Sequence, residues 1–168
     1  MTNVEIRERT VEDTQEFCRF LNTLDNEARY MLYEKGERIL DLDLVRNNIQ
    51  SIINNKDACY VALINGSIIG FIIAVREKFI RTKHSAVIVV GILEKYCGRG
   101  IGSELFHQVF LWASENDVKR LELTVVSHNK RALSLYNKLG FKLEGTKEMS
   151  ILIDKKYCNE YLMGKLLF

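Results

Sequence analysis

The 168-residue sequence contains no apolar run that approaches the roughly 20 residues of a membrane-spanning helix. Its start, Met1 to Glu5, also lacks the basic and then apolar layout of a secretory signal peptide. The first absence argues against a transmembrane protein and the second against a secreted one. We therefore expect a cytoplasmic protein without a membrane partner.

Cysteine is scarce and scattered. The four cysteines include no C-x-x-C pair, and they lie far apart in the sequence, at Cys18, Cys59, Cys97 and Cys158. Zinc sites and disulfide frameworks are normally built on closer and more regular spacings. The sequence therefore predicts reduced thiols and no metal.

An excess of one charge is also missing. The net charge is only +2 and the basic residues are dispersed along the chain, whereas nucleic acid is usually met by a basic stripe or patch. Nucleic acid is therefore not an expected partner. The hydrophobic share of 47% and the charged share of 27% are ordinary for a soluble globular chain. At this length, one domain over residues 1–168 is expected.

The first third of the chain has a strand followed by helices. Val4 to Arg9 alternates apolar and charged residues as a half-buried strand does, and Thr10 then opens a helix through about Leu21. Asp25 to Leu40 is rich in charge and aromatic residues and has a weaker period. Asp41 to Ile53 places its apolar residues on one helical face and predicts a second helix.

The middle of the chain reads as strands. Ala58 to Ile64 and Ser67 to Val75 are apolar, β-branched runs joined by Asn65-Gly66, a strong hairpin signal because both turn positions need positive φ. Ala86 to Ile92 is continuously apolar, which fits a central strand buried on both faces.

The last third alternates helices and strands. A helix is expected from the glycine-rich segment after Ile92 to about Asn116, and another from Asn129 to Leu139, ended by Gly140. The strands expected here are Leu121 to Val126, Phe141 to Leu143, Met149 to Ile153 and Tyr161 to Met163, the last three in a terminal hairpin. The order of elements predicts an α+β, or mixed α/β, chain around a mixed sheet.

The segment from Cys97 to Gly102, between a strand and a helix, suits an anion. Glycines let the backbone approach a ligand, and the first turn of a helix has unbonded N–H groups at a positive dipole end. A tight turn without a ligand is the alternative. A Walker A loop is excluded because the sole Gly-Lys pair, Gly164-Lys165, is followed by Leu166, and no G-x-G-x-x-G is completed.

Two motifs resemble the GNAT family of N-acetyltransferases. Val90 to Ser103 looks like its acetyl-CoA motif, with the core [QR]-x-x-G-x-[GA]; Gly100 and Gly102 match, whereas Cys97 stands where the family usually has Gln or Arg. Leu123 to Phe141 resembles the second conserved half, N-x-x-A-x-x-L-Y-x-x-x-G-F. Together the motifs and the elements around them cover most of the chain after residue 58.

The resemblance implies a twisted, mostly antiparallel sheet of six to seven strands flanked by about four helices in αβα layers. It also implies an acceptor-side helical region, 1–57, before an acetyl-CoA-binding core, 58–168. The positions that match the family's cofactor contacts are Val90, Gly91, Ile92, Gly98, Arg99, Gly100, Ile101, Gly102, Ser103, Asn129 and Tyr136.

The same resemblance assigns chemical roles. A backbone N–H from Val90 to Ile92 would polarise the thioester carbonyl, with Gly91 suggesting a local interruption of strand hydrogen bonding. Asn129 would hold the pantetheine arm, and the Tyr136 hydroxyl, with an ordinary pKa near 10, would return a proton to the departing thiolate. Asn129 and Tyr136 are two helical turns apart and share one face. A core aromatic is the alternative reading of Tyr136.

The general base must come from another position, because Thr124 occupies a strand position at which many relatives carry Glu. Glu27 is the first candidate, since some relatives place a glutamate in the equivalent helical segment; Glu34 and His84 follow. A solvated surface carboxylate is the alternative for the glutamates. Tyr30 and Tyr33 are candidates for lining the acceptor pocket or for the core.

The expected activity is acetyl transfer from acetyl-CoA, as a cosubstrate, to a primary amine by direct attack in a ternary complex. The acceptor is a small molecule or a protein N-terminus, and a homodimer is left open. The alternative is a catalytically silent acyl-CoA-binding module that senses the cofactor or docks a partner.

Overall fold

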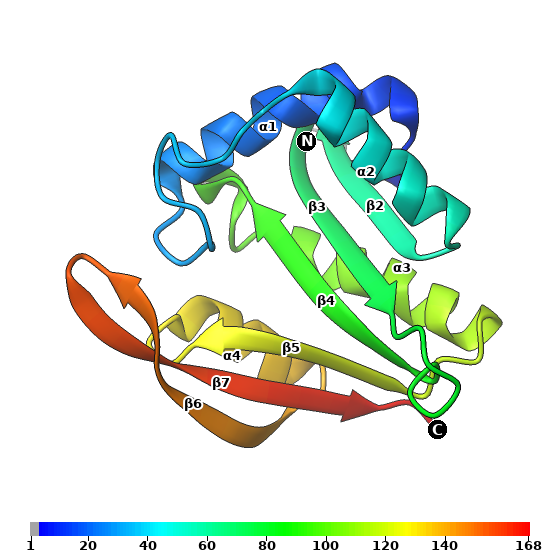
Figure 1. Cartoon of the computed structure of the whole chain (residues 1–168), viewed down its shortest axis with the longest axis vertical. Coiled ribbons are helices and arrows are strands. Elements are labelled where there is room, and N and C mark those ends of the chain that lie inside the picture. Colours follow the sequence, from blue (N-terminus) through cyan, green and yellow to red (C-terminus); the bar gives the residue numbers. More distant parts are fainter. Residues whose placement is uncertain (1–3) are drawn as a thin grey trace. The chain divides into compact units, whose positions relative to one another are not determined.

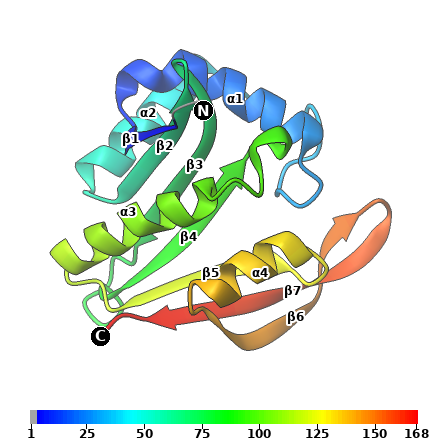
Figure 2. The same ribbon diagram turned by 180° about the vertical axis from the view of Figure 1, so that it is seen from behind.

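The computed structural model describes residues 4–168. The helices are α1 (Thr14–Glu27), α2 (Leu42–Asn54), α3 (Ile101–Glu115) and α4 (Lys130–Lys138), with short 3-10 turns η1 (Val11–Asp13) and η2 (Glu94–Tyr96). The strands are β1 (Glu5–Glu8), β2 (Ala58–Ile64), β3 (Ser67–Arg76), β4 (Ser85–Ile92), β5 (Arg120–Val126), β6 (Lys142–Ile153) and β7 (Lys156–Leu166). Figure 1 labels the four helices and strands β2 to β7, and Figure 2 also labels β1.

The strands form one seven-stranded sheet in the order β1-β2-β3-β4-β5-β7-β6. β1 with β2, β2 with β3, β5 with β7 and β6 with β7 are antiparallel, whereas β4 pairs with β5 in parallel. The predicted mixed, mostly antiparallel sheet with helices on it is confirmed. β4 is the fourth of the seven strands, so its central position is confirmed as well.

The chain divides into two compact units. The first takes in the chain up to Val75 together with Val89–Trp112, and the second consists of Arg76–Ile88 and Ala113–Phe168. The expected single domain, with an acceptor-side region ending at residue 57, stays a prediction. Among the described residues, no helix is long and apolar enough to cross a membrane.

A carboxylate fixes the start of the first unit. Asp13 accepts two hydrogen bonds from the guanidinium of Arg7, at 2.8 and 2.7 Å, and a third from the Thr10 backbone N–H at 2.8 Å. β1 is thereby tied to the turn that leads into α1. The predicted helix start after Thr10 is confirmed, although the helix runs six residues beyond the predicted Leu21, to Glu27.

Asp13→Asn is expected to lower the free energy of unfolding by about 2 kcal/mol at pH 7, because hydrogen bonds to a charged group contribute roughly 1.5–3 kcal/mol. The Arg7 guanidinium is the main reason that the pKa of Asp13 is lowered. The stabilisation is therefore complete above the unfolded pKa of about 3.9 and is lost as the pH falls through the lower folded pKa. Urea unfolding at pH 7 and pH 3 measures this, and the variant's deficit should shrink at about pH 3.

The matched control for Asp13 is Glu16→Gln, whose carboxylate pairs with Arg19 on the exposed surface of α1 at 3.1 Å. Exposed pairs of this kind are worth about 0.5 kcal/mol, so its stability should barely change. An Asp13→Asn deficit of the same size at both pH values would contradict the role given to the carboxylate.

The first hairpin has the predicted turn. Ala58 to Ile64 pairs antiparallel with Ser67 to Ala74, and the turn residues Asn65 and Gly66 have φ of 51° and 78°. Asn tolerates this left-handed conformation and Gly adopts it without steric cost. The hairpin predicted at Asn65-Gly66 is therefore confirmed.

Helices cover both faces of β3 in the first unit. Figure 1 shows α1 and α2 on the near side of β2 and β3, and Figure 2, seen from behind, shows α3 in front of β3. A Cβ atom at Gly91 would lie 2.8 Å from side-chain atoms of both Leu24 and Phe71. On the other face, a Cβ at Gly70 would lie 3.6 Å from Leu105 of α3. The missing side chain at Gly91 thus makes room for Leu24 of α1, whereas a Cβ at Gly70 would be at ordinary contact distance from α3.

Aromatic residues join α1 to the sheet. The rings of Phe17 and Phe20 each meet the ring of Phe71 edge-on, with centroids 5.5 and 5.8 Å apart. All three are at most 5% exposed. Edge-to-face pairs add about 0.5–1.5 kcal/mol beyond the area they bury, so this cluster fixes the position of α1 on β3.

Two sequence-based expectations need correction. The run Ala86 to Ile92 is not buried on both faces, since Val87 is 37% and Val89 43% exposed; residues 86 and 88 point into the core and the alternate side chains do not. The terminal strands are also longer than predicted. β6 is one continuous strand with bulges. Its polar residues interrupt the alternation of apolar side chains from which a strand is predicted. Its turn to β7 uses Asp154 and Lys155, both with positive φ, without a glycine.

Candidate active site

The glycine loop adopts a conformation that depends on two of its glycines. Gly98 and Gly100 have φ of 75° and 86°, a region that other residues rarely adopt. A Cβ at either would meet nothing within 4 Å, and both residues are exposed. The loop therefore presents open backbone to the surface.

Helix α3 begins directly after this loop. The N–H of Glu104 donates to the carbonyl of Gly100 at 3.2 Å, the first bond of the helix. The N–H groups of Ile101, Gly102 and Ser103 precede it and have no acceptor within the helix. Together with the positive dipole end of α3, such N–H groups suit an anion, and anion binding at this loop stays a prediction.

Basic side chains lie beside the loop. The guanidinium of Arg99 is 5.4 Å and the Lys95 ammonium 4.8 Å from the centre of the Tyr96 ring. Tyr96 in turn packs against the hydrophobic core of the first unit. The Tyr96 ring thus holds two positive charges from residues that precede or belong to the loop.

Cys97 turns its sulfur back into the protein. Its Sγ lies 3.7 and 3.6 Å from the carbonyl oxygens of Ile92 and Leu93. The small thiol of Cys97 fits in this position beside the two carbonyl groups. A long Gln or Arg side chain does not need to turn back in this way. The structure is consistent with Cys97 as a packing residue at the end of β4.

The stretch Val90 to Ile92 lies within a regular strand. β4 extends to Ile92, and the next residue, Leu93, still donates to the carbonyl of Ile69 in β3 at 2.9 Å. Close packing against Leu24 and Phe71 accounts for the glycine at position 91, and the interruption of strand hydrogen bonding suggested there stays a prediction.

Glu27, at the last residue of α1, bonds to the segment that follows β4. Its Oε1 accepts a hydrogen bond of 2.6 Å from the backbone N–H of Glu94, at the start of η2. The Glu27 carboxylate thus contacts Glu94, which is two residues after Ile92, although α1 and β4 are far apart along the chain. The structure brings this sequence-predicted residue to the carboxyl end of β4.

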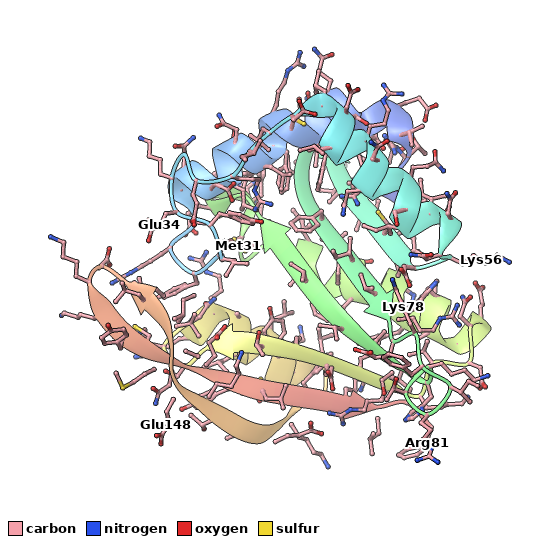
Figure 3. The ribbon with its side chains drawn as sticks, in the orientation of Figure 1. Met31, Glu34, Lys56, Lys78, Arg81 and Glu148 are labelled. Atoms are coloured by element: carbon pink, nitrogen blue, oxygen red, sulfur yellow. The ribbon has the colours of Figure 1, made fainter. Side chains whose placement is uncertain are left out.

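The other candidate bases lie elsewhere. Glu34, labelled in Figure 3, lies on the exposed segment between α1 and α2, where its backbone N–H donates to Glu37 at 2.9 Å. His84 precedes the first residue of β4, whereas the glycine loop follows the last. Its carbonyl accepts from Lys119 and Arg120 in the second unit.

A buried ion pair anchors the segment between α1 and α2. The guanidinium of Arg38 donates to both oxygens of Asp25, at 2.6 and 3.0 Å, and the Asp25 side chain is only 5% exposed. Arg38 also lies over the ring of Tyr33 at 4.0 Å. Tyr33 is therefore part of this anchor, while Tyr30 has the guanidinium of Arg29 5.7 Å from its ring centre.

In the second unit, Asn129 caps helix α4. Its Oδ1 accepts a hydrogen bond of 3.2 Å from the N–H of Ala132, which leaves the amide NH₂ as the donor end of the side chain. Asn129 thus precedes the helix that was expected to begin with it.

Tyr136 is buried in the same unit. It is 7% exposed, and its ring centre lies 6.0 Å from that of Phe141. Burial raises the pKa of Tyr136 to about 12, because the phenolate would lose its hydration. The phenol therefore holds its proton throughout the neutral range, as a general acid must.

Comparison with known proteins decides the family. The model of the Acetyltransferase (GNAT) family matches residues 11–141. This chain belongs to that family. An L-amino acid N-acetyltransferase, AaaT, from Escherichia coli (strain K12) is 29% identical over 107 residues, which cover 63% of this chain and 66% of AaaT. The match thus spans just under two thirds of that relative.

Solved structures show the same fold. An acetyltransferase of the GNAT family from Streptococcus pneumoniae has a TM-score of 0.93 at 28% identity, covering 98% of this chain and 100% of that one. The yncA protein of Salmonella typhimurium, solved with its cofactor acetyl-CoA, has a TM-score of 0.85 at 16% identity, covering 98% and 94%. At that identity the second likeness concerns the fold alone.

This GNAT chain carries two departures from the family pattern that the resemblance described. Thr124 lies on β5 opposite Leu162 of β7, exposed, with a hydroxyl that cannot act as a base. At the second departure, the Sγ of Cys97 faces the carbonyl oxygens of Ile92 and Leu93. The Asp25–Arg38 anchor was missed by sequence reasoning, because the two residues are 13 positions apart and no periodic pattern joins them.

Proposed function

We propose that this GNAT chain transfers the acetyl group of acetyl-CoA to a primary amine. The observation that carries the proposal is the loop from Gly98 to Gly100, whose open backbone leads into the unbonded N–H groups at the start of α3. Such amides suit the pyrophosphate of a coenzyme. Lys95 and Arg99, both against the Tyr96 ring, add positive charge in this segment of the chain.

The cofactor contacts are proposed residue by residue. The amides from Gly98 to Ser103 bind the pyrophosphate, and the NH₂ group of Asn129 donates to the pantetheine arm. A backbone N–H from Val90 to Ile92 polarises the thioester carbonyl. Preorganised donors of this kind stabilise the charge that develops on the oxygen as the amine attacks.

Two side chains move protons in the proposed reaction. Glu27 is the general base: Oε1 is engaged by the N–H of Glu94, so Oε2 takes the proton from the ammonium or, through water, from the attacking amine. Tyr136 donates its proton to the sulfur as the carbon–sulfur bond breaks. An amine of pKa near 10 needs such a base at neutral pH.

The acceptor is proposed to be a small molecule or a protein N-terminus that reaches the carboxyl end of β4 beside Glu27. The relative AaaT is named for L-amino acids, which supports a small amine. The homodimer and the cytoplasmic location stay predictions. Among the described residues, no cluster of His, Cys, Asp and Glu is arranged to hold a metal ion.

Calorimetric titration of acetyl-CoA, followed by thiol release across a panel of amines, tests the proposal. Binding and turnover with at least one primary amine are the expected results. Binding without turnover on any amine would favour a silent acyl-CoA sensor, which the departures at Cys97 and Thr124 keep in view. Failure to bind would overturn both functions.

Gly100→Ala is expected to weaken acetyl-CoA binding about 10-fold. An alanine at φ near 86° is strained by roughly 1 kcal/mol or more, and the loop relieves the strain by moving the amides away from the phosphate. Calorimetry measures the affinity. Gly36→Ala, at φ of 78° in the α1–α2 segment with open space around it, carries similar strain away from the loop and should leave the affinity unchanged.

A further inference from the structure

Cys158 and His128 form a thiol–imidazole pair in the second unit. The Sγ of Cys158, on β7, lies 3.3 Å from Nε2 of His128, in the turn between β5 and α4. Nδ1 of the same imidazole lies 3.3 Å from Oγ of Ser127. The imidazole of His128 thus contacts a nucleophile, Cys158, through one nitrogen and a group that can orient it, Ser127, through the other. This arrangement activates thiols.

The backbone holds both partners in place. The N–H of Ser127 donates to the carbonyl of Asn159 at 2.9 Å, which ties the end of β5 to β7 beside Cys158. Within the turn, the backbone N–H of Asn129 donates to the carbonyl of Val126, and that of Lys130 donates to the carbonyl of His128, both at 2.9 Å. The distance between thiol and imidazole is therefore fixed by the sheet and by the start of α4.

The other cysteines have different surroundings. Burial raises the pKa of the Cys18 and Cys59 thiols, which keeps them protonated. The sulfur of Cys97 faces two carbonyl oxygens, which accept a hydrogen bond but do not take the proton. Cys158 also lies 3.5 Å from the carbonyl of Lys156, but it differs from the other three in its contact with the imidazole of His128.

We propose that Cys158 accepts an acyl group from a thioester, with His128 as its base. The imidazole takes the thiol proton, and the sulfur attacks the acyl carbonyl carbon. The bond between that carbon and the donor's sulfur breaks, and the departing thiolate receives the proton from the imidazolium. The products are S-acyl-Cys158 and a free thiol, so no oxidant or reductant is needed.

The identity of the natural donor rests on the proposed function. Asn129, assigned to the pantetheine arm of acetyl-CoA, directly follows His128 in sequence. An acyl thioester held by Asn129 would therefore be delivered close to the pair. Cys158 is 7% exposed whereas His128 is exposed, so the thioester approaches from the side of the imidazole.

The test uses the full chain without an amine and two donors: acetyl-CoA, and the acetyl thioester of N-acetylcysteamine, which lacks the nucleotide. Peptide mass spectrometry locates the acetyl group, and hydroxylamine should release it. Cys158 is expected to be acetylated faster than the more exposed Cys97 in the same sample. His128→Gln should lower the rate of Cys158 acetylation about 100-fold, which is the effect expected from loss of a general base.

His107→Gln is the matched control, because this exposed histidine lies on α3 in the first unit and is not part of the thiol–imidazole pair, and it should leave the rate unchanged. An equal rate in His128→Gln, or no acetyl group on Cys158 with either donor, would overturn the inference. If acetyl-CoA binds and amines turn over in that case, the proposed function stands without it. Acetylation by the small donor alone, without acetyl-CoA binding, would support the pair and overturn the proposed function.

Discussion

Tyr136→Phe is expected to lower kcat for acetyl transfer about 100-fold while leaving the affinity for acetyl-CoA nearly unchanged. Removal of a general acid usually costs 10²- to 10⁴-fold, and phenylalanine keeps the ring that packs 6.0 Å from Phe141. Steady-state kinetics with the best amine of the panel gives kcat, and calorimetry gives the affinity.

The high pKa of Tyr136 makes this result diagnostic. With the pKa of Tyr136 raised to about 12 by burial, the wild-type phenol stays protonated at neutral pH, so the variant differs only by the missing hydroxyl. Thermal unfolding should shift little, because the ring remains. Equal losses of kcat and of cofactor affinity would show that the hydroxyl serves the structure and not proton transfer.

Tyr161→Phe is a suitable control for the same chemistry. Tyr161 lies on β7 opposite Val125 and Thr146, also in the second unit, and it is half-buried. Its hydroxyl has no role in the proposed reaction. Removing it should leave kcat within about twofold of wild type, since substitutions away from functional features usually have effects within about 0.5 kcal/mol.

Arg38→Met is expected to have the largest effect on stability, lowering the free energy of unfolding by about 3 kcal/mol. The substitution leaves the Asp25 carboxylate, which is 5% exposed, without its bidentate partner. Breaking a buried ion pair by removing one partner usually costs about 3–5 kcal/mol, because an uncompensated charge remains buried. Urea unfolding at pH 7 measures the loss.

The double variant Asp25→Leu with Arg38→Met separates the buried charge from simple packing. Replacing both partners by apolar residues of similar volume is often neutral, so most of the lost stability should return. If the double variant is as unstable as Arg38→Met, the cost lies in lost packing against Tyr33 and not in the unpaired carboxylate.

The same pair should affect the acceptor more than the cofactor. Arg38 ties the segment between α1 and α2 to the last turns of α1, two residues before Glu27. In Arg38→Met, we expect KM for the amine to rise while the affinity for acetyl-CoA stays the same. A weakened affinity for acetyl-CoA with an unchanged amine KM would show that this segment serves the cofactor and not the amine.

The local pattern of the sequence was enough for most elements. The Asn65-Gly66 turn and the stop at Gly140 each use a residue whose backbone chemistry specifies the structure by itself. By contrast, β6 carries exposed polar residues and a turn at Asp154-Lys155, so its pairing with β7 follows from register across the sheet and not from a local signal.

The glycine loop could be located from the sequence for a similar reason. Gly98 and Gly100 must be glycine because of their own φ angles, a property of single residues. Gly91 looked alike in the sequence but has another cause, since its missing side chain makes room for Leu24 and Phe71. A packing constraint of that kind depends on residues distant in the chain.

The sequence by itself determined the family, the glycine loop and the helix that Asn129 caps and that carries Tyr136, because short motifs and periodicity act over a few residues. Only the tertiary structure decided that Glu27 bonds to the N–H of Glu94, that Asp25 is paired with Arg38 and that His128 faces Cys158. Each of these contacts joins residues at least 13 positions apart, and chain folding, which follows from burial of the whole apolar surface, brings them together.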